Sequence, residues 1–152
     1  MYEMNCAKGR MAERYACMRL NQAGINAVVV ECRGVMGTPD LITDGGIYID
    51  VKYSLPFYKR NNPSTKYYKY NLHHHGAKQT NIDYFIFVLG DIVWSPLFVF
   101  PATLCDSKTY KISEKQILGG ELGFFRNNFD IIKANPGRPN VDFETHLARW
   151  IP

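Results

Sequence analysis

Residues 37–54 read GTPDLITDGGIYIDVKYS, and in this stretch two runs rich in apolar residues stand on either side of a turn signal. The Asp44-Gly45-Gly46 cluster is typical of a tight turn between antiparallel strands, because such turns need the positive φ angles that glycine adopts most easily. We therefore predict a β-hairpin, with one strand over residues 40–43 and the other over residues 47–54.

The predicted hairpin carries charges that a purely structural strand pair does not need. If the turn is centred on Gly45, Asp40 lies directly opposite Asp50, with about 5 Å between their Cβ atoms. Two carboxylates at this distance repel each other unless a cation lies between them or one of them is protonated. Because side chains alternate between the faces of a strand, Lys52 shares a face with Asp50. The sequence thus predicts two carboxylates and one ammonium group at a single site.

Such a site suits a hard divalent cation, and Mg²⁺ in particular binds one or two carboxylates together with waters and phosphate oxygens. A metal ion held by Asp40 and Asp50 could polarise a phosphodiester and lower the pKa of an attacking water. Lys52 would orient that water or stabilise the charge of the transition state. The carbonyl of Val51 would add a backbone ligand to the metal.

Each charged residue also has an ordinary structural explanation. Asp40 could cap a turn, and Asp50 with Lys52 could be an exposed ion pair on a strand. Taken together these explanations are weaker, because Ile49 and Val51 occupy one face of the strand and leave the charged residues together on the other. We therefore favour a functional site.

Outside the hairpin, periodicity and composition predict further elements. A helical pattern covers residues 7–23, and residues 113–125 are expected to be partly helical. Apolar runs of strand length, rich in β-branched and aromatic residues, occur at residues 26–32, 82–90 and 97–102. This order predicts an α+β fold, with a mixed β-sheet flanked by helices.

The composition is that of one folded domain over residues 1–152. Hydrophobic residues make up 46% and aromatic residues 14%, which suffices for a core, and 152 residues are few for two domains. Eighteen basic and 14 acidic residues give a net charge of +4, which mildly favours anionic partners. The chain shows no signal-peptide pattern and no apolar run of about 18 residues. We therefore expect a soluble cytoplasmic protein with no membrane contact.

The hairpin motif resembles that of a known nuclease superfamily. Pro39-Asp40, nine intervening residues and Asp50-Val51-Lys52 match the PD-(D/E)xK pattern. The resemblance implies a restriction-endonuclease-like core in the order helix, strand, hairpin, helix, strand. It also implies a Mg²⁺ cofactor that Mn²⁺ could replace, and a homodimer that cuts DNA.

The N-terminal part is similar in particular to archaeal-type Holliday junction resolvases. The similarity rests on KGRMAER at 8–14, PDLI at 39–42 and IDVK at 49–52. Downstream the chain departs from the resolvases, and residues 82–104 look more like the strand pair of restriction, homing and phage or bacterial nucleases. The resemblance therefore carries fold and chemistry further than it carries the substrate.

The resemblance also implies an acid on the first helix as a further metal or water ligand, and Glu13 matches it. Met11, Tyr15 and Met18 have the spacing of a buried stripe. Glu13 lies about 200° from Met11 around the helix, away from this stripe. It can reach the metal only if the helix lies with its edge over the sheet.

A basic and aromatic segment follows the hairpin. Between Asp50 and Asp83 the chain has no acid, while lysines and tyrosines are interleaved. We expect residues 55–78 to form a long loop with at most a short strand. This loop would neutralise phosphates and offer rings to unpaired bases, with a solvated basic loop as the alternative. Three adjacent histidines at 73–75 cannot easily point to one ion, so we expect them to be in an exposed or phosphate-facing loop. The residues expected to contact nucleic acid are Lys8, Arg10, Lys59, Arg60, Lys66, Lys69, Lys78 and Gln79; the last two also match a lysine or glutamine often found after the hairpin in the superfamily.

These inferences predict a metal-dependent DNA endonuclease with Glu13, Asp40, Asp50 and Lys52 as its catalytic residues. Four alternatives remain open: a junction- or structure-selective nuclease, a sequence-specific homing or restriction enzyme, an RNA-directed enzyme, and a catalytically inactive nucleic-acid-binding module.

Overall fold

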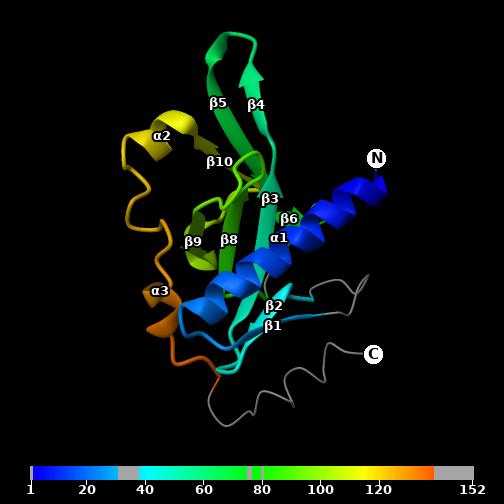
Figure 1. Ribbon diagram of the computed structural model, residues 1–152, viewed down its shortest axis with the longest axis vertical. Helices are drawn as coiled ribbons and strands as arrows, with labels where there is room; N and C mark the ends of the chain where they lie inside the picture. The colour runs from blue at the N-terminus through cyan, green and yellow to red at the C-terminus, as the bar shows by residue number, and fades with distance from the viewer. Residues whose placement is uncertain (1, 31–37, 75–76, 80, 139–152) are drawn as a thin grey trace.

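The computed structural model describes residues 2–30, 38–74, 77–79 and 81–138 (Figure 1). The helices are α1 (Tyr2–Gln22), the 3₁₀ helix η1 (Ala102–Leu104), α2 (Glu114–Leu118) and α3 (Asp130–Lys133). The strands are β1 (Ala27–Val29), β2 (Leu41–Thr43), β3 (Tyr48–Ser54), β4 (Pro56–Lys59), β5 (Asn62–Asn71), β6 (His73–His74), β7 (Ala77–Lys78), β8 (Tyr84–Leu89), β9 (Leu97–Pro101) and β10 (Thr109–Ser113).

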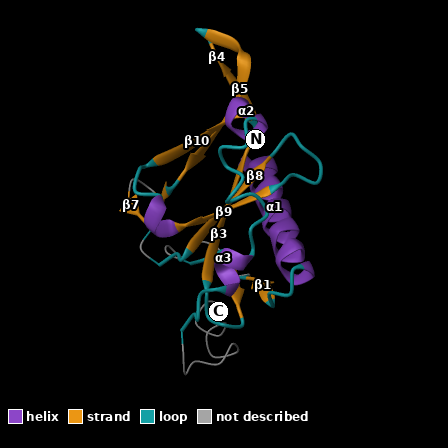
Figure 2. Ribbon diagram, turned by 90° about the vertical axis from the view of Figure 1, so that its left-hand side faces the viewer, coloured by secondary structure: helices purple, strands orange, loops and turns teal. Residues whose placement is uncertain are grey.

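A five-stranded sheet in the order β1-β2-β3-β8-β9 forms the centre of the molecule. β3 and β8 are parallel and the other neighbours are antiparallel, so the sheet is mixed. α1 crosses one face of the sheet, and the small sheet β10-β5-β4 lies toward the other side (Figure 2). The predicted α+β fold with a central mixed sheet is confirmed.

Two apolar cores hold these layers together. Under α1, the helix residues Ala16 and Leu20 pack against sheet residues such as Ile49 and Ile86. On the other face, the core contains mainly aromatic side chains from β5, β8 and β9, among them Phe87, which stacks on Tyr110 with 5.3 Å between ring centroids. Every side chain of β8 is buried, as expected for a strand covered on both faces.

The predicted hairpin is confirmed as β2 and β3. Leu41 pairs with Ile49 and Ile42 with Tyr48, which is the register that a turn centred on Gly45 requires. The turn contains Gly46 at a φ of 76°, where a residue with a side chain would be strained. The strands predicted at 82–90 and 97–102 are present as β8, which is next to β3 in the sheet, and β9, which is next to β8.

The buried stripe predicted for the first helix is wrong. Met11 is 67% exposed and Met18 is 37% exposed, whereas Ala12, Ala16 and Leu20 are buried. The alanine side is the better face for packing, because small side chains let the helix backbone approach the sheet closely.

The prediction of a long loop over residues 55–78 is also wrong, because this segment forms β4, β5 and the short strands β6 and β7. Tyr68 and Tyr70 are buried while Lys69 between them is exposed, which is the alternation of a strand with one covered face. Aromatic residues favour strands when they can pack on a neighbouring layer, and here that layer is the central sheet. The connection from β3 to β8 therefore contains strands, and its described residues contain no helix such as the superfamily order would place there.

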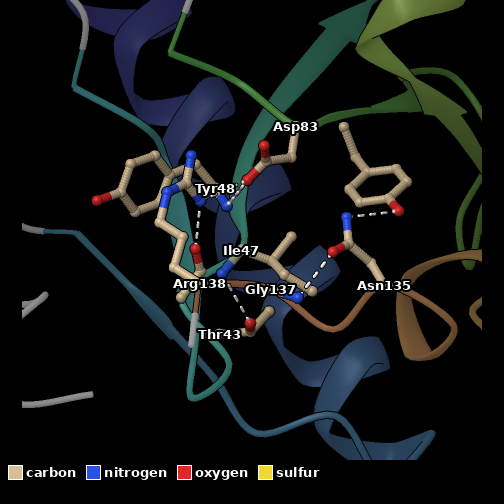
Figure 3. A network of polar contacts seen from close by, with 9 residues as sticks. Thr43, Ile47, Tyr48, Asp83, Asn135, Gly137 and Arg138 are labelled. Atoms are coloured by element: carbon tan, nitrogen blue, oxygen red, sulfur yellow. Dashed lines mark hydrogen bonds and ion pairs between the residues drawn. The ribbon is translucent and has the colours of Figure 1, made fainter. Parts of the chain in front are cut away.

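The chain after α3 returns to the turn of the hairpin. The Arg138 guanidinium lies 4.0 Å from the centre of the Tyr48 ring and donates a hydrogen bond of 2.8 Å to Asp83 (Figure 3). The backbone N–H of Arg138 donates to the carbonyl of Gly45 at 2.9 Å. These contacts fix the turn end of the hairpin from outside. None of the described helices is long and apolar enough to cross a membrane.

Gly137 makes this contact possible, and we expect Gly137→Ala to destabilise the protein by about 1–3 kcal/mol. Its φ is +72°, and an added Cβ would overlap the carbonyl of Gly45. Gly120 is a matched control, because its φ is +76° but nothing lies within 4 Å of an added Cβ. Urea unfolding of both variants measures the difference. Equal losses for Gly137→Ala and Gly120→Ala would show that the contact with the turn contributes nothing.

Candidate active site

The backbone of Asp40 is held from both sides. Its carbonyl accepts a hydrogen bond from the N–H of Val30 at 2.9 Å, and its own N–H donates to the carbonyl of Ile49 at 3.0 Å. The side chain is fixed too, since carboxylate Oδ2 accepts a hydrogen bond of 2.8 Å from the N–H of Val51. Strand pairing therefore places this carboxyl group against β3.

Asp50 is 5% exposed, and it belongs to the strand that lies in the middle of the sheet. Nζ of Lys52 lies 2.9 Å from Oδ2 of Asp50, an ion pair between two residues on one face of β3. Although this oxygen is buried, it forms no well-oriented hydrogen bond with any described residue. A buried carboxylate oxygen that lacks a hydrogen bond can be stabilised by a further positive partner.

Asp40 and Asp50 interact directly. Burial raises the pKa of Asp40 well above its ordinary value, the charges of Asp50 and Glu13 raise it further, and a hydrogen bond with the Asp50 carboxyl adds to the increase. The hydrogen bond from the N–H of Val51 opposes this only in part. Without a cation, Asp40 thus keeps its proton to a higher pH than an ordinary aspartic acid does.

Glu13 is 8% exposed and lies beside Ala12 on the side of α1 that packs on the sheet. The helix therefore does not turn Glu13 away from the sheet, as the predicted stripe required. Its charge is close enough to act on the Asp40 carboxyl. From the sequence, this acid was predicted only through the family resemblance. The neighbouring alanines Ala12 and Ala16, which mark the buried side of the helix, are the sequence signal that could have supported it.

The donor set fits Mg²⁺ better than a metal that needs a complete protein cage. Within the described residues, no three His, Cys, Asp or Glu side chains form a ready metal cluster. Mg²⁺ binds through one or two carboxylates and keeps several waters, so Asp40 and Asp50 suffice as direct ligands. Asp50 Oδ2 is buried and has the Lys52 ammonium at 2.9 Å, so a metal ion there would be a second positive partner of this oxygen.

A cleft of about 380 Å³ opens beside Lys52 at the end of β3. It is lined by Gly9, Tyr53 and neighbouring residues of β3, and Gly9 stands between Lys8 and Arg10 in the chain. Arg10 is exposed and Lys8 is partly buried. Lys8 and Arg10 flank Gly9 in the chain, but Lys8 lines a separate pocket together with Tyr15. Lys52 is thus the basic residue that lines the cleft itself, where it suits a phosphate group.

The fold is similar to that of a bacterial homing endonuclease. The solved structure of I-Ssp6803I matches this chain with a TM-score of 0.58 over 84% of this chain and 90% of that chain. The two sequences are 17% identical, so the likeness concerns the fold alone. No protein-family model and no curated protein sequence matches the chain.

The basic residues expected to contact nucleic acid on the 55–78 segment differ in whether they form ion pairs. Arg60 and Lys69 are exposed, and Nζ of Lys59 lies 4.5 Å above the centre of the Tyr67 ring. Lys66 is different, because it forms ion pairs with Asp91 at 3.0 Å and with Glu114 at 3.3 Å. Lys66 therefore connects β5 to neighbouring elements.

Gln79 does not lie among the residues around the hairpin acids. It lines a separate cavity of about 240 Å³ together with His73, Phe85 and Cys105. His73, expected in an exposed or phosphate-facing loop, is partly buried, and neither of its ring nitrogens has a hydrogen-bond partner among the described residues. The side chain of Lys78 lies outside the described residues, as do those of His74 and His75.

Without metal, we expect stability to fall as the pH rises through the raised pKa of Asp40. The folded protein keeps a proton on Asp40 at pH values where the unfolded chain, with a pKa near 4, has lost it. This contribution is complete below the unfolded pKa and disappears above the folded one. Asp40→Asn should flatten the dependence and raise stability near neutral pH, because it removes one of two like charges. Thermal unfolding in EDTA between about pH 4 and pH 8 measures this.

The exposed turn residue Asp44 provides the control, and Asp44→Asn should retain the pH dependence of the wild type. An Asp40→Asn variant with an unchanged slope against pH would contradict the assignment of the proton to Asp40.

Mg²⁺ should raise the unfolding midpoint of the wild type at neutral pH, because a cation offsets the repulsion between Asp40 and Asp50. At 100 times the dissociation constant the gain is about 2.7 kcal/mol. Asp50→Asn should lose most of this gain, and Asp44→Asn should keep it. Calorimetric titration gives the affinity independently of any activity. Equal stabilisation of all three proteins would mean that the ion binds elsewhere.

Proposed function

We propose that the protein is a metal-dependent DNA endonuclease of the PD-(D/E)xK type, which hydrolyses phosphodiester bonds. The observation that carries the proposal is the pair of the partly buried Asp40 and the buried Asp50, with Lys52 at 2.9 Å from Asp50, on a hairpin next to an open cleft. Stability does not account for this arrangement, because like charges of this kind destabilise a fold unless a cation compensates. The nuclease-like fold agrees with this proposal.

Each residue of the site has a distinct task in this reaction. Asp40 and Asp50 would hold Mg²⁺, with Mn²⁺ as a substitute, the Val51 carbonyl as a further ligand and Glu13 acting through a bound water. Such an ion supplies a Lewis acid and neutralises charge on the phosphate. Lys52, oriented by its ion pair with Asp50, donates a hydrogen bond to the attacking water or to a phosphate oxygen. The N–H of Val51 keeps Asp40 in position throughout.

The substrate proposed is DNA, and the likeness of the fold to that of a homing endonuclease favours it over RNA. A catalytically inactive binding module is the weaker alternative, because the acids and the lysine of the motif are all present and are brought together. Since a duplex has two strands to cut, we propose that the active form is a homodimer.

Cleavage should depend on both Asp50 and Lys52. We expect Asp50→Asn and Lys52→Ala each to reduce the rate of Mg²⁺-dependent cleavage by about 10²-fold or more, because one removes a metal ligand and the other a transition-state donor. The assay follows nicking and linearisation of plasmid DNA, with four-way junctions, single-stranded DNA and RNA as further substrates.

The matched controls are Asp44→Asn and Lys111→Ala, which change exposed residues of the same type on the hairpin turn and on β10. Both should cleave at the rate of the wild type. Wild-type activity in Asp50→Asn would refute the proposed site, and equal activity with and without Mg²⁺ would refute the metal requirement.

A further inference from the structure

The hairpin of β4 and β5 projects beyond the rest of the molecule (Figures 1 and 2). It begins two residues after the end of β3, the strand that carries Asp50 and Lys52. The nuclease reaction uses none of the residues at its tip. The direction of β3 therefore also determines the position of this hairpin relative to Asp50 and Lys52.

The base of the hairpin is firmly attached. β10 pairs with β5 from Tyr67 to Asn71, so this part is a three-stranded sheet. The Tyr68 hydroxyl donates a hydrogen bond of 2.7 Å to Asp91, and the same carboxylate binds Lys66. Burial alone would raise the pKa of Asp91, but the hydrogen bonds from Tyr68 and Lys66 outweigh it and lower the pKa. The carboxylate thus stays charged and holds the base in place.

Beyond this base, the hairpin is a two-stranded ribbon. Residues 62–66 of β5 pair with β4 only, and the two strands meet at a turn that contains Arg60 and Asn61. Both side chains are exposed, and neither has a polar contact with the described residues. By contrast, the side chain of Asn62 is engaged with Tyr67 and Ser64. The tip therefore has two exposed side chains without polar contacts to the described residues, and the three-stranded base supports it.

The tyrosines of β4 and β5 do not form a platform for unpaired bases. Tyr68 and Tyr70 are each 1% exposed, and the ring of Tyr67 is occupied by Lys59 and by Phe57 at 5.8 Å between ring centroids. Tyr58 alone on the two strands is a largely exposed ring among the described residues, at 56%. The stacking expected from the composition needs several open ring faces, and the structure does not provide them.

We propose that the β4–β5 ribbon enters the major groove of duplex DNA and that Arg60 and Asn61 read base edges there. The inference rests on the proposed nuclease function and adds the substrate class: a duplex recognised by sequence. The major groove, about 12 Å wide, admits a two-stranded ribbon. Arginine binds guanine through two hydrogen bonds and asparagine binds adenine in the same way. The chain has no acid from residue 51 to residue 82, and the acids that contact β5 from other elements, Asp91 and Glu114, are paired with Lys66 near the base of the hairpin, so the tip carries no negative charge of its own.

The chain itself limits the distance between recognition and cleavage. At about 3.3 Å per strand residue, the eight residue steps from Lys52 to Arg60 span at most about 26 Å. One base pair occupies about 3.4 Å along the helix, so the bases read by the tip lie within about eight base pairs of the cut. Lys59 at the end of β4 and Lys69 in the three-stranded base of the hairpin would contact phosphates beside the groove.

The test is selection of bound duplexes from a randomised DNA library by the whole protein, in EDTA so that nothing is cut. The wild type should select a guanine or an adenine at defined positions. Arg60→Ala should reduce discrimination at the guanine by about 5- to 150-fold, and Asn61→Ala should do so at the adenine. Cleavage of the selected duplex with Mg²⁺ then gives the distance from these bases to the cut.

Two controls separate reading from general affinity. Lys69→Ala should weaken binding to all sequences alike and reduce the slope of log K against log salt by about one. Arg126→Ala, an exposed arginine far along the chain from the ribbon, should change neither the affinity nor the selected sequence. Because Arg60 and Asn61 are exposed at a turn, the unfolding midpoints of their alanine variants should match that of the wild type.

The outcomes distinguish this inference from the function on which it rests. If the protein binds and cuts DNA but Arg60→Ala and Asn61→Ala select the wild-type sequence, the ribbon is not the reader. Tighter binding of the wild type to four-way junctions or single strands than to any duplex would also overturn the inference while leaving the nuclease intact. If the protein binds no nucleic acid, both proposals fail.

Discussion

The close approach of Asp40 and Asp50 is the constraint on which the site depends. The register of the β2–β3 hairpin, with Leu41 opposite Ile49, produces it. A slip of one residue would turn the apolar side chains of the strand to the wrong face, so the core that stabilises the fold also fixes the two acids. Removing one acid would relieve repulsion in the folded state. The arrangement is therefore consistent with the proposed cation site.

The central strand β3 connects the proposed active site to the hairpin that is proposed to bind DNA. It carries Asp50 and Lys52, borders the cleft beside α1, and continues almost directly into the projecting ribbon. A strand paired on both sides in a sheet bends little, so β3 fixes the base of the hairpin relative to Asp50 and Lys52. Asp91 completes this support from the turn after β8, since it receives both Lys66 and Tyr68.

Sequence reasoning succeeded where the signals are local. The turn at Gly45, the hairpin register and the apolar runs of β8 and β9 follow from neighbouring residues, and the structure contains them. It failed where packing between distant segments decides. Tyr68 and Tyr70 read as a polar, aromatic loop, because their burial depends on the central sheet, and the contact between Arg138 and Asp83 joins residues 55 positions apart with no sequence signal. The roles of the site residues remain predictions.

The helix α1 shows how packing and chemistry are linked. Ala12 and Ala16 let the helix lie close to the sheet, and this closeness buries Glu13, whose charge then acts on Asp40. A larger residue at either alanine would move the acid outward and lower its influence on the site. Met11 and Met18 remain exposed, so the helix is oriented by burial of Ala12, Ala16 and Leu20 and not of the methionines. A third acid near Asp40 and Asp50 raises the pKa of Asp40 further, and a cation at the proposed site would lower this repulsion. The helix, as well as the hairpin, is therefore consistent with the proposed metal-dependent reaction.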